Sequence, residues 1–135
     1  MYDRLMTKVK AAVEGKKPDT ITFVWMQGER DAREKHGDVY AASMAGLVEQ
    51  LLSDLGRKDV NVVIGRLSDC NTDAHWTMVR QAQVQAAEAD PRGAWVDTDD
   101  LNGPSNALHY TKQGYAELGK RFAAKAVELI RKPEK

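Results

Sequence analysis

Residues 21–32 read ITFVWMQGERDA, and the architecture of the chain is organised around this stretch. Its first part, Ile21–Met26, is an almost unbroken apolar and β-branched run, which indicates a strand covered on both faces. The run ends abruptly at residues 27–31, QGERD, where polar and ionisable side chains crowd around a glycine. Ligands of parallel sheets bind beyond the carboxyl ends of the strands. We therefore expect the functional site to lie directly after this strand.

Four other segments have the apolar spacing of amphipathic helices. They are residues 2–14, 38–55, about 74–89, and a last helix that begins near residue 111. The last helix is expected to turn a wide apolar face inward, formed by Tyr115, Leu118, Phe122, Ala126, Val127 and Ile130.

Two further strands are predicted, at residues 60–65 and 94–97. The segments that follow the three strands are polar, at residues 27–38, 66–73 and 98–110, and are expected to be loops. Because helices and strands alternate throughout, the sequence predicts an α/β fold with a parallel sheet and right-handed crossovers.

The composition argues against several classes of function. The chain has 135 residues, enough for one domain, and 20 basic residues balance 20 acidic ones. The net charge therefore gives no indication of nucleic acid or an anionic membrane as partner. No apolar run approaches the roughly 18 residues of a membrane-spanning helix. Residues 1–10 also lack the apolar core of a secretion signal.

No motif indicates a metal or a cofactor. Cys70 is the single cysteine, which excludes an intrachain disulfide and a paired-cysteine zinc site. The three histidines, His36, His75 and His109, have no metal-ligand spacing, and no glycine-rich phosphate loop occurs. We expect neither a metal nor a cofactor.

Four sequence blocks, taken in order, carry a family resemblance. They read WMQGERDA from Trp25, IGRLSD from Ile64, WTMVRQAQ from Trp76, and DTDDL from Asp97 followed by LHYTKQGYAELGKRFA from Leu108. From about residue 21 to about residue 124, the chain resembles the sialate O-acetylesterase-type carbohydrate esterases of the SGNH hydrolase superfamily. The resemblance implies a three-layer, flavodoxin-like domain with helices on both faces of a parallel sheet. It also implies an ester hydrolase that removes acetyl groups from sugar hydroxyls through an acyl-serine intermediate.

The resemblance assigns roles to two groups of residues. Gln27 matches the position of a side-chain amide in the oxyanion hole, Gly28 lets the backbone turn closely there, and Glu29 is expected to hold the loop by accepting backbone hydrogen bonds. His109 matches the catalytic histidine, whereas the aspartate expected three residues earlier is Asn106.

Asparagine can orient an imidazole, but it does not stabilise the imidazolium that forms during catalysis. Asp97, Asp99 and Asp100 are the alternative carboxylates, if their loop folds back. Arg80 and Gln83, one helical turn apart, are expected to brace the active-site loops from below.

One block of the family is missing from the sequence. These esterases begin with a strand that ends in a GQSN-like turn carrying the nucleophilic serine, and residues 1–135 contain no such segment. The first predicted strand, in contrast, has the sequence of a strand from inside a sheet. We therefore expect the amino-terminal strands of the fold to be missing, the serine to lie outside this chain, and the chain alone to be nearly inactive.

Other interpretations remain open at this point. Ser68 and Cys70 follow the second strand and are candidate nucleophiles within the chain, although neither sits on a glycine-flanked elbow. A set of Cys70, His109 and Asn106 would follow the logic of thiol proteases. A non-catalytic pseudo-esterase that binds carbohydrate, or a module that forms homo-oligomers through an apolar strand edge, is the alternative function.

Overall fold

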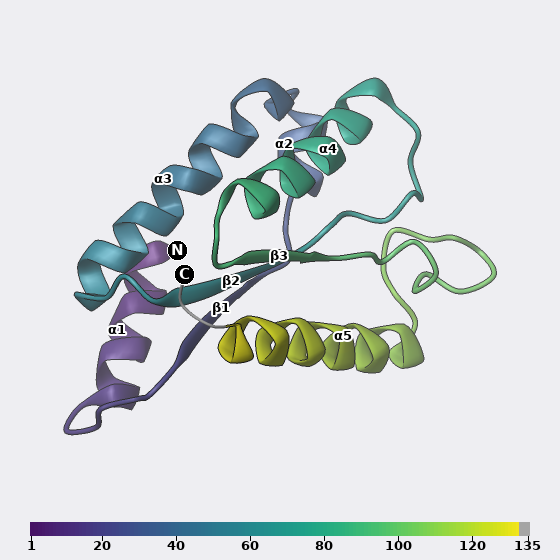
Figure 1. Ribbon diagram of the computed structural model, residues 1–135. Helices are drawn as coiled ribbons and strands as arrows, with labels where there is room; N and C mark the ends of the chain where they lie inside the picture. Colours follow the sequence, from purple (N-terminus) through teal and green to yellow (C-terminus); the bar gives the residue numbers. More distant parts are fainter. Residues whose placement is uncertain (133–135) are drawn as a thin grey trace.

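The computed structural model describes residues 1–132 and contains three parallel strands with helices on both faces of the sheet (Figure 1). In chain order the elements are α1 (Tyr2–Val13), β1 (Ile21–Trp25), α2 (Glu29–Arg33), α3 (Gly37–Leu55), β2 (Val60–Gly65), α4 (Ala74–Ala89), β3 (Gly93–Val96) and α5 (Lys112–Arg131). Helices α3 and α4 cover one face, and α5 lies along the other. The predicted α/β class and parallel sheet are confirmed.

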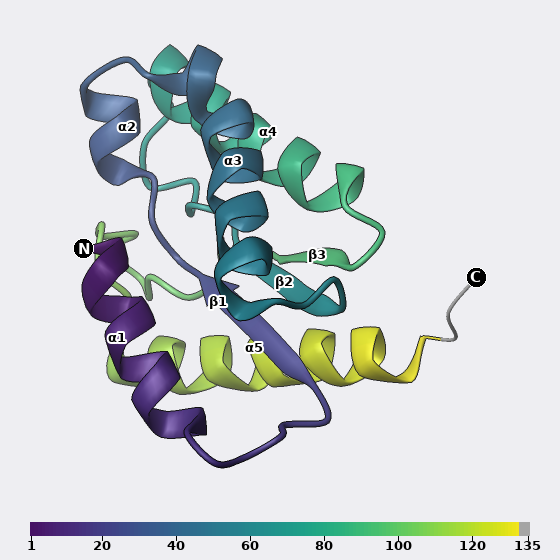
Figure 2. The ribbon, with the colours of Figure 1, turned by 90° about the vertical axis from the view of Figure 1, so that its left-hand side faces the viewer.

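The strand order is β1-β2-β3, so the central strand is β2. In register, Ile21 lies beside Val60 and Val62 lies beside Gly93. Every residue of β2 is buried, as its largely apolar sequence predicts, including the polar Asn61. Strand β1, in contrast, lies at an edge and pairs with β2 alone among the described residues (Figure 2).

The prediction that β1 is covered on both faces is wrong on the side of Val24. Phe23 and Trp25 pack into the core with Met44 of α3 and Ile64 of β2. Val24 points to the opposite face and is 45% exposed. The reason is the placement of α5, which packs on β2 and β3 and leaves this face of β1 uncovered.

The predicted inward face of α5 is also too wide. Leu118 and Phe122 are buried against Val63, Val96 and Leu101, as expected. Three other predicted core residues, Tyr115, Val127 and Ile130, are exposed. A helix that lies on a narrow sheet buries only the central part of its apolar stripe.

The predicted loop 27–38 contains a helical turn, α2, which sequence reasoning missed. Its five residues, ERDAR, include a single apolar side chain, so they show no helical periodicity. That side chain, Ala32, is buried against Leu67 and Trp76, and its backbone N–H donates to the carbonyl of Gly28 over 3.0 Å. Tertiary packing therefore determines this turn. Within residues 1–132, no helix is long and apolar enough to cross a membrane.

Two glycines of α5 give a matched test of how this helix meets the loop before it. A side chain on Gly114 would overlap the carbonyl oxygen of Leu101, whereas nothing lies within 4 Å of the corresponding position at Gly119. Gly114→Ala should lower the free energy of unfolding by about 1–3 kcal/mol through this clash. Gly119→Ala should raise it by up to about 1 kcal/mol, because alanine favours helix. Urea denaturation measures both, and an equal effect of the two changes would contradict the close approach.

Candidate functional site

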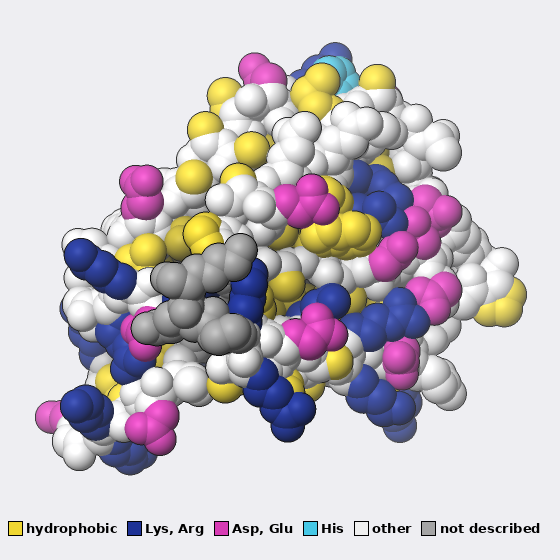
Figure 3. Space-filling model, in the orientation of Figure 1, with side chains coloured by type: hydrophobic (Ala, Val, Ile, Leu, Met, Phe, Trp, Pro, Cys, Tyr) yellow, Lys and Arg dark blue, Asp and Glu magenta, His cyan; other side chains and the backbone are white. Residues whose placement is uncertain are grey.

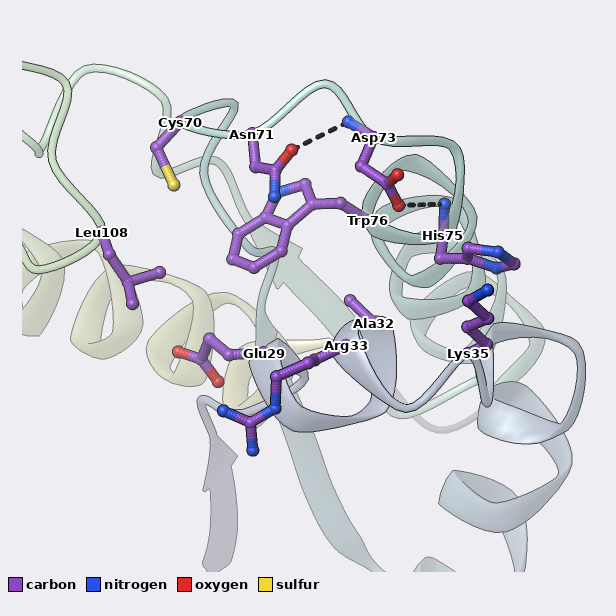
Figure 4. Close-up of a pocket in the computed structure, with 10 residues that line it drawn as sticks. All are labelled: Glu29, Ala32, Arg33, Lys35, Cys70, Asn71, Asp73, His75, Trp76 and Leu108. Carbon is purple, nitrogen blue, oxygen red and sulfur yellow. Dashed lines mark hydrogen bonds between the residues drawn. The ribbon is translucent and has the colours of Figure 1, made fainter.

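The loops that follow β1, β2 and β3 meet at the carboxyl edge of the sheet and enclose two cavities. One, of about 400 Å³, is lined by residues of all three loops, including Ser68 and His109. The other, of about 590 Å³, lies between α2 and the β2–α4 loop (Figure 4). Glu29, Trp76 and Leu108 line both cavities, so the two cavities adjoin, and together they are called the crevice below.

The structure brings His109, Glu29 and Ser68 to the same cavity. His109 is exposed on its wall, and no side chain among residues 1–132 forms a hydrogen bond with its imidazole. Ser68 is almost completely buried, and its carbonyl oxygen accepts a hydrogen bond from Trp76 Nε1 over 2.8 Å. Cys70 lies in the neighbouring 590 Å³ cavity rather than beside His109.

Gln27 and Asn106 lie elsewhere. The amide of Gln27 donates to Asp31 Oδ2 over 2.6 Å and lines a separate cavity with Tyr40. Asn106 adopts a positive φ of 43° and donates from Nδ2 to Asp69 Oδ1 over 3.3 Å. In this structure, therefore, neither side chain contacts the cavity that holds His109.

The backbone of Gly28 and the side chain of Glu29 form a local contact of chemical interest. Gly28 N–H donates to Glu29 Oε2 over 3.0 Å, in line with the expected loop-holding role of Glu29. A carboxylate oxygen thus occupies the position that an oxyanion would take at this backbone donor.

A buried amide fixes the β1 and β2 ends of the crevice. Gln83 of α4 is fully buried; its Oε1 accepts from Leu67 N over 2.8 Å, and its Nε2 donates to the carbonyl of Gln27 over 2.8 Å. Tyr40 OH donates to the same carbonyl over 2.7 Å. A Cβ on Gly28 would come within 2.9 Å of Gln83 Nε2, so glycine is needed for this close packing. Gln83 thereby braces both loops, as its sequence position indicates.

Tyr110 anchors the residue next to His109. Its hydroxyl donates to Thr98 Oγ1 over 2.9 Å, and Thr98 Oγ1 in turn donates to the carbonyl of Arg66 over 2.7 Å. Burial raises the pKa of Tyr110 to about 12, so the phenol stays protonated as a donor at neutral pH. This chain of hydrogen bonds ties the His109 loop to the ends of β2 and β3.

The three aspartates considered as alternative partners of His109 are bound to arginines. Asp99 accepts from Arg80 over 2.7 and 3.0 Å and from Arg66 over 2.9 Å. Arg66 also reaches Asp97, and Arg121 binds Asp100 through both of its terminal nitrogens. Figure 3 shows basic and acidic side chains close together on the right-hand side of the molecule, the side on which the β3–α5 loop lies in Figure 1. The arrangement braces this loop and leaves these carboxylates occupied.

Asp99 has the most strongly engaged of these carboxylates. Burial alone would raise its pKa, but the hydrogen bond from Arg80 and the charges of Arg66 and Arg80 outweigh burial and hold the pKa below its ordinary value. Among residues 1–132, no group of three or more His, Cys, Asp and Glu side chains is placed to hold a metal ion.

Sequence reasoning missed two residues that shape the site, Tyr40 and Trp76. Both occupy apolar-stripe positions of helices and therefore look like ordinary core residues. Their polar atoms nevertheless hold the carbonyls of Gln27 and Ser68. Two aromatic residues that carry donors, each opposite a functional loop, were the available signal.

The Gln83 brace can be tested by an isosteric change. Gln83→Met keeps the length of the side chain but leaves Leu67 N–H without its partner, whereas the carbonyl of Gln27 keeps Tyr40. We expect the free energy of unfolding to fall by about 1–3 kcal/mol. Gln81→Met, on the exposed side of the same helix, should change it by less than about 0.5 kcal/mol. Chemical denaturation measures both variants. Equal losses in the free energy of unfolding for Gln83→Met and Gln81→Met would contradict the bracing role of Gln83.

The Asp99 ion pairs predict a pH dependence. Because the folded pKa lies below the unfolded value, their stabilisation is complete above about pH 4 and is lost as the pH falls through the folded pKa. Asp99→Asn should therefore cost about 1–2 kcal/mol at pH 7, and the deficit should shrink towards pH 3. Thermal unfolding at both pH values measures this, and a deficit independent of pH would exclude the ion pairs as its cause.

Comparisons with known proteins identify a family and a similar fold. A sequence model of the family described as carbohydrate esterase, sialic acid-specific acetylesterase, matches residues 1–128. No curated protein matches the chain in sequence. A crystal structure of a protein from Arabidopsis thaliana has a similar fold, with a TM-score of 0.79 at 22% sequence identity. The similarity covers 94% of this chain but 52% of the plant protein, so the chain spans about half of that protein's length.

The likeness to the plant structure supports the flavodoxin-like fold predicted from the sequence, and the family match extends over nearly the whole chain. The chain therefore belongs to the sialic acid-specific acetylesterase family of carbohydrate esterases.

Proposed function

We propose that residues 1–135 form the part of a carbohydrate O-acetylesterase that supplies its histidine base and its oxyanion-binding loop. The serine nucleophile comes from polypeptide outside these residues. One observation carries the proposal: within residues 1–132, β1 is paired along one edge only, and its carboxyl end lies at the crevice that holds Glu29 and His109. A strand added in parallel to this edge would end next to Gly28, which follows β1.

An open apolar surface beside β1 supports the docking of such a strand. Arg121 of α5 reaches Asp97 and Asp100, which follow β3. By helical geometry, Ile130 lies on the flank of α5 turned away from β3. It is 44% exposed, and Val24 is exposed on the same face of the sheet. An added strand and its connections would cover these side chains and complete the apolar environment of β1.

The chemistry follows from the groups that line the crevice. The serine hydroxyl attacks the acetyl carbonyl while His109 takes its proton, and His109 then protonates the departing sugar oxygen. Water, deprotonated by the same imidazole, attacks the acetyl-serine and releases acetate. The N–H of Gly28 stabilises the negative charge on the tetrahedral oxygen by donating a hydrogen bond to it. The amide of Gln27 is a second donor once it leaves Asp31.

Glu29 is the carboxylate that we place beside His109. Among residues 1–132, it is the one carboxylate that lines the cavity with the imidazole, whereas Asn106 contacts Asp69. Its present contact is the N–H of Gly28. A turn of the Glu29 side chain towards His109 would stabilise the imidazolium and free this N–H for the oxyanion.

Addition of the serine strand is the direct test. We expect residues 1–135 alone to hydrolyse an aryl acetate at the background rate. A fusion that adds a serine-bearing strand from another member of the family, ahead of Met1, should turn it over. In the fusion, His109→Ala should lower kcat by about 100-fold or more. His36→Ala is the control, because His36 is exposed and lies outside both cavities.

Other results would favour a different nucleophile or a different function. Rapid hydrolysis by residues 1–135 alone, abolished by Ser68→Ala or Cys70→Ala, would place the nucleophile inside the chain and contradict the proposal. A fusion that binds saccharide without turnover would favour the second candidate, a non-catalytic carbohydrate-binding module. The observation behind that candidate is Asn106, which stands where the family pattern has aspartate and contacts Asp69. Self-association through β1 would appear as concentration-dependent dimers in light scattering.

A further inference from the structure

We propose that the 590 Å³ cavity between α2 and the β2–α4 loop is the subsite for the sugar part of the ester, and that it accepts a neutral, hydroxyl-rich saccharide. The inference rests on the proposed function, because it assigns the two ends of one crevice to the two halves of an ester.

The shape and lining of this cavity suit a sugar ring. Figure 4 shows Trp76 at its centre, with Ala32 of α2 across from the indole. Leu108 lies at one end, and Lys35 and His75 lie together at the other. The volume falls within the usual range for small-ligand sites, about 300–1,000 Å³. An apolar floor with a polar end at Lys35 and His75 matches a pyranose, whose C–H faces are apolar and whose rim carries hydroxyls.

Two polar groups of this cavity are free to bind a ligand. The ammonium of Lys35 has no hydrogen bond or ion pair within residues 1–132. Asn71 uses its Oδ1 to accept from Asp73 N over 2.9 Å, which leaves its NH₂ group available. Both groups can donate to the oxygen of a ligand hydroxyl.

The charges on the walls favour a neutral ligand over an anion. Glu29 and Asp73 balance Arg33 and Lys35 around the cavity. The first turn of α4 is a natural anion site, but the carboxylate of Asp73 already occupies it by accepting from His75 N over 2.8 Å. An added anion would meet two carboxylates, whereas hydroxyls can both donate to these and accept from Lys35 and Asn71.

The other end of the crevice suits the acetyl group. The 400 Å³ cavity around His109 has a largely apolar wall that includes Met26, Leu67 and Leu118. The scissile bond then lies between the cavities, where Glu29, Trp76 and Leu108 line both. This orientation sends the departing sugar oxygen towards α2 and places it within the part of the crevice shared with His109.

A titration of residues 1–135 followed by ¹⁵N NMR tests the subsite without any turnover. Cellobiose, a neutral disaccharide, should shift the indole N–H signal of Trp76 and the backbone amides of Lys35 and Asn71. The indole signals of Trp25 and Trp95, bonded to Tyr40 and Glu88 away from the cavity, should stay in place. Lys35→Met should weaken binding by about five-fold, the loss of one hydrogen bond. Lys58→Met, between α3 and β2, is the matched control.

The result that would overturn the proposal is equally specific. Absence of a Trp76 shift with cellobiose rejects the subsite. Binding of N-acetylneuraminic acid but not cellobiose, lost in Lys35→Met, rejects the neutral ligand. The titration reports binding alone, so the two proposals can fail separately. Trp76 shifts without hydrolysis by the serine-strand fusion support the saccharide subsite and reject the esterase proposal. Hydrolysis without Trp76 shifts supports the esterase proposal and rejects the subsite.

Discussion

The side-chain amide of Gln83 is the contact through which the two halves of the crevice keep their spacing. It lies fully inside the protein and hydrogen-bonds to backbone groups that follow two different strands, Gln27 O after β1 and Leu67 N after β2. Backbone groups just beyond the end of a strand have no hydrogen-bond partner in the sheet. Where such a group is buried, another part of the protein must supply its hydrogen bond. A single glutamine supplies one donor and one acceptor at fixed separation. Gln83 thereby helps to fix Gly28 and Ser68 relative to each other, together with Tyr40, which binds the same carbonyl of Gln27, and Trp76, which binds the carbonyl of Ser68.

The open edge of β1 is a second constraint, of the opposite kind. A central strand such as β2 satisfies its backbone on both sides and buries both faces, whereas β1 does so on one side and leaves Val24 uncovered. Soluble proteins protect such edges with charges, bulges or cover, because a free apolar edge promotes pairing with other chains. The sequence of β1 has none of these features. The proposed strand, paired with β1 in parallel, would account for both the composition of β1 and its place beside the crevice.

The sequence was sufficient for the order of elements and for the strand ends, but less so for the site. Val60–Gly65 is apolar except for Asn61, and it is buried at every residue, as the sequence predicts. The turn α2 was not predicted, because Ala32 is its single apolar residue and its helix depends on packing against Trp76. The sequence also did not predict the direction of a side chain. Gln27 follows β1 as expected, yet its amide donates to Asp31. Such choices depend on partners distant in sequence, and periodicity carries no information about them.

The choice of carboxylate for His109 can be argued from what each candidate would have to give up. Asp99 would leave two arginines, one of them bound through both nitrogens, and Asp100 would leave Arg121. Breaking such charge-assisted contacts costs more than breaking a neutral one, because it leaves a cation unpaired. Glu29 would leave one backbone N–H, that of Gly28. In the proposed mechanism, the movement that would bring a charge to the imidazole would also free the backbone donor proposed for the oxyanion, which would couple the two requirements of ester hydrolysis in one side chain.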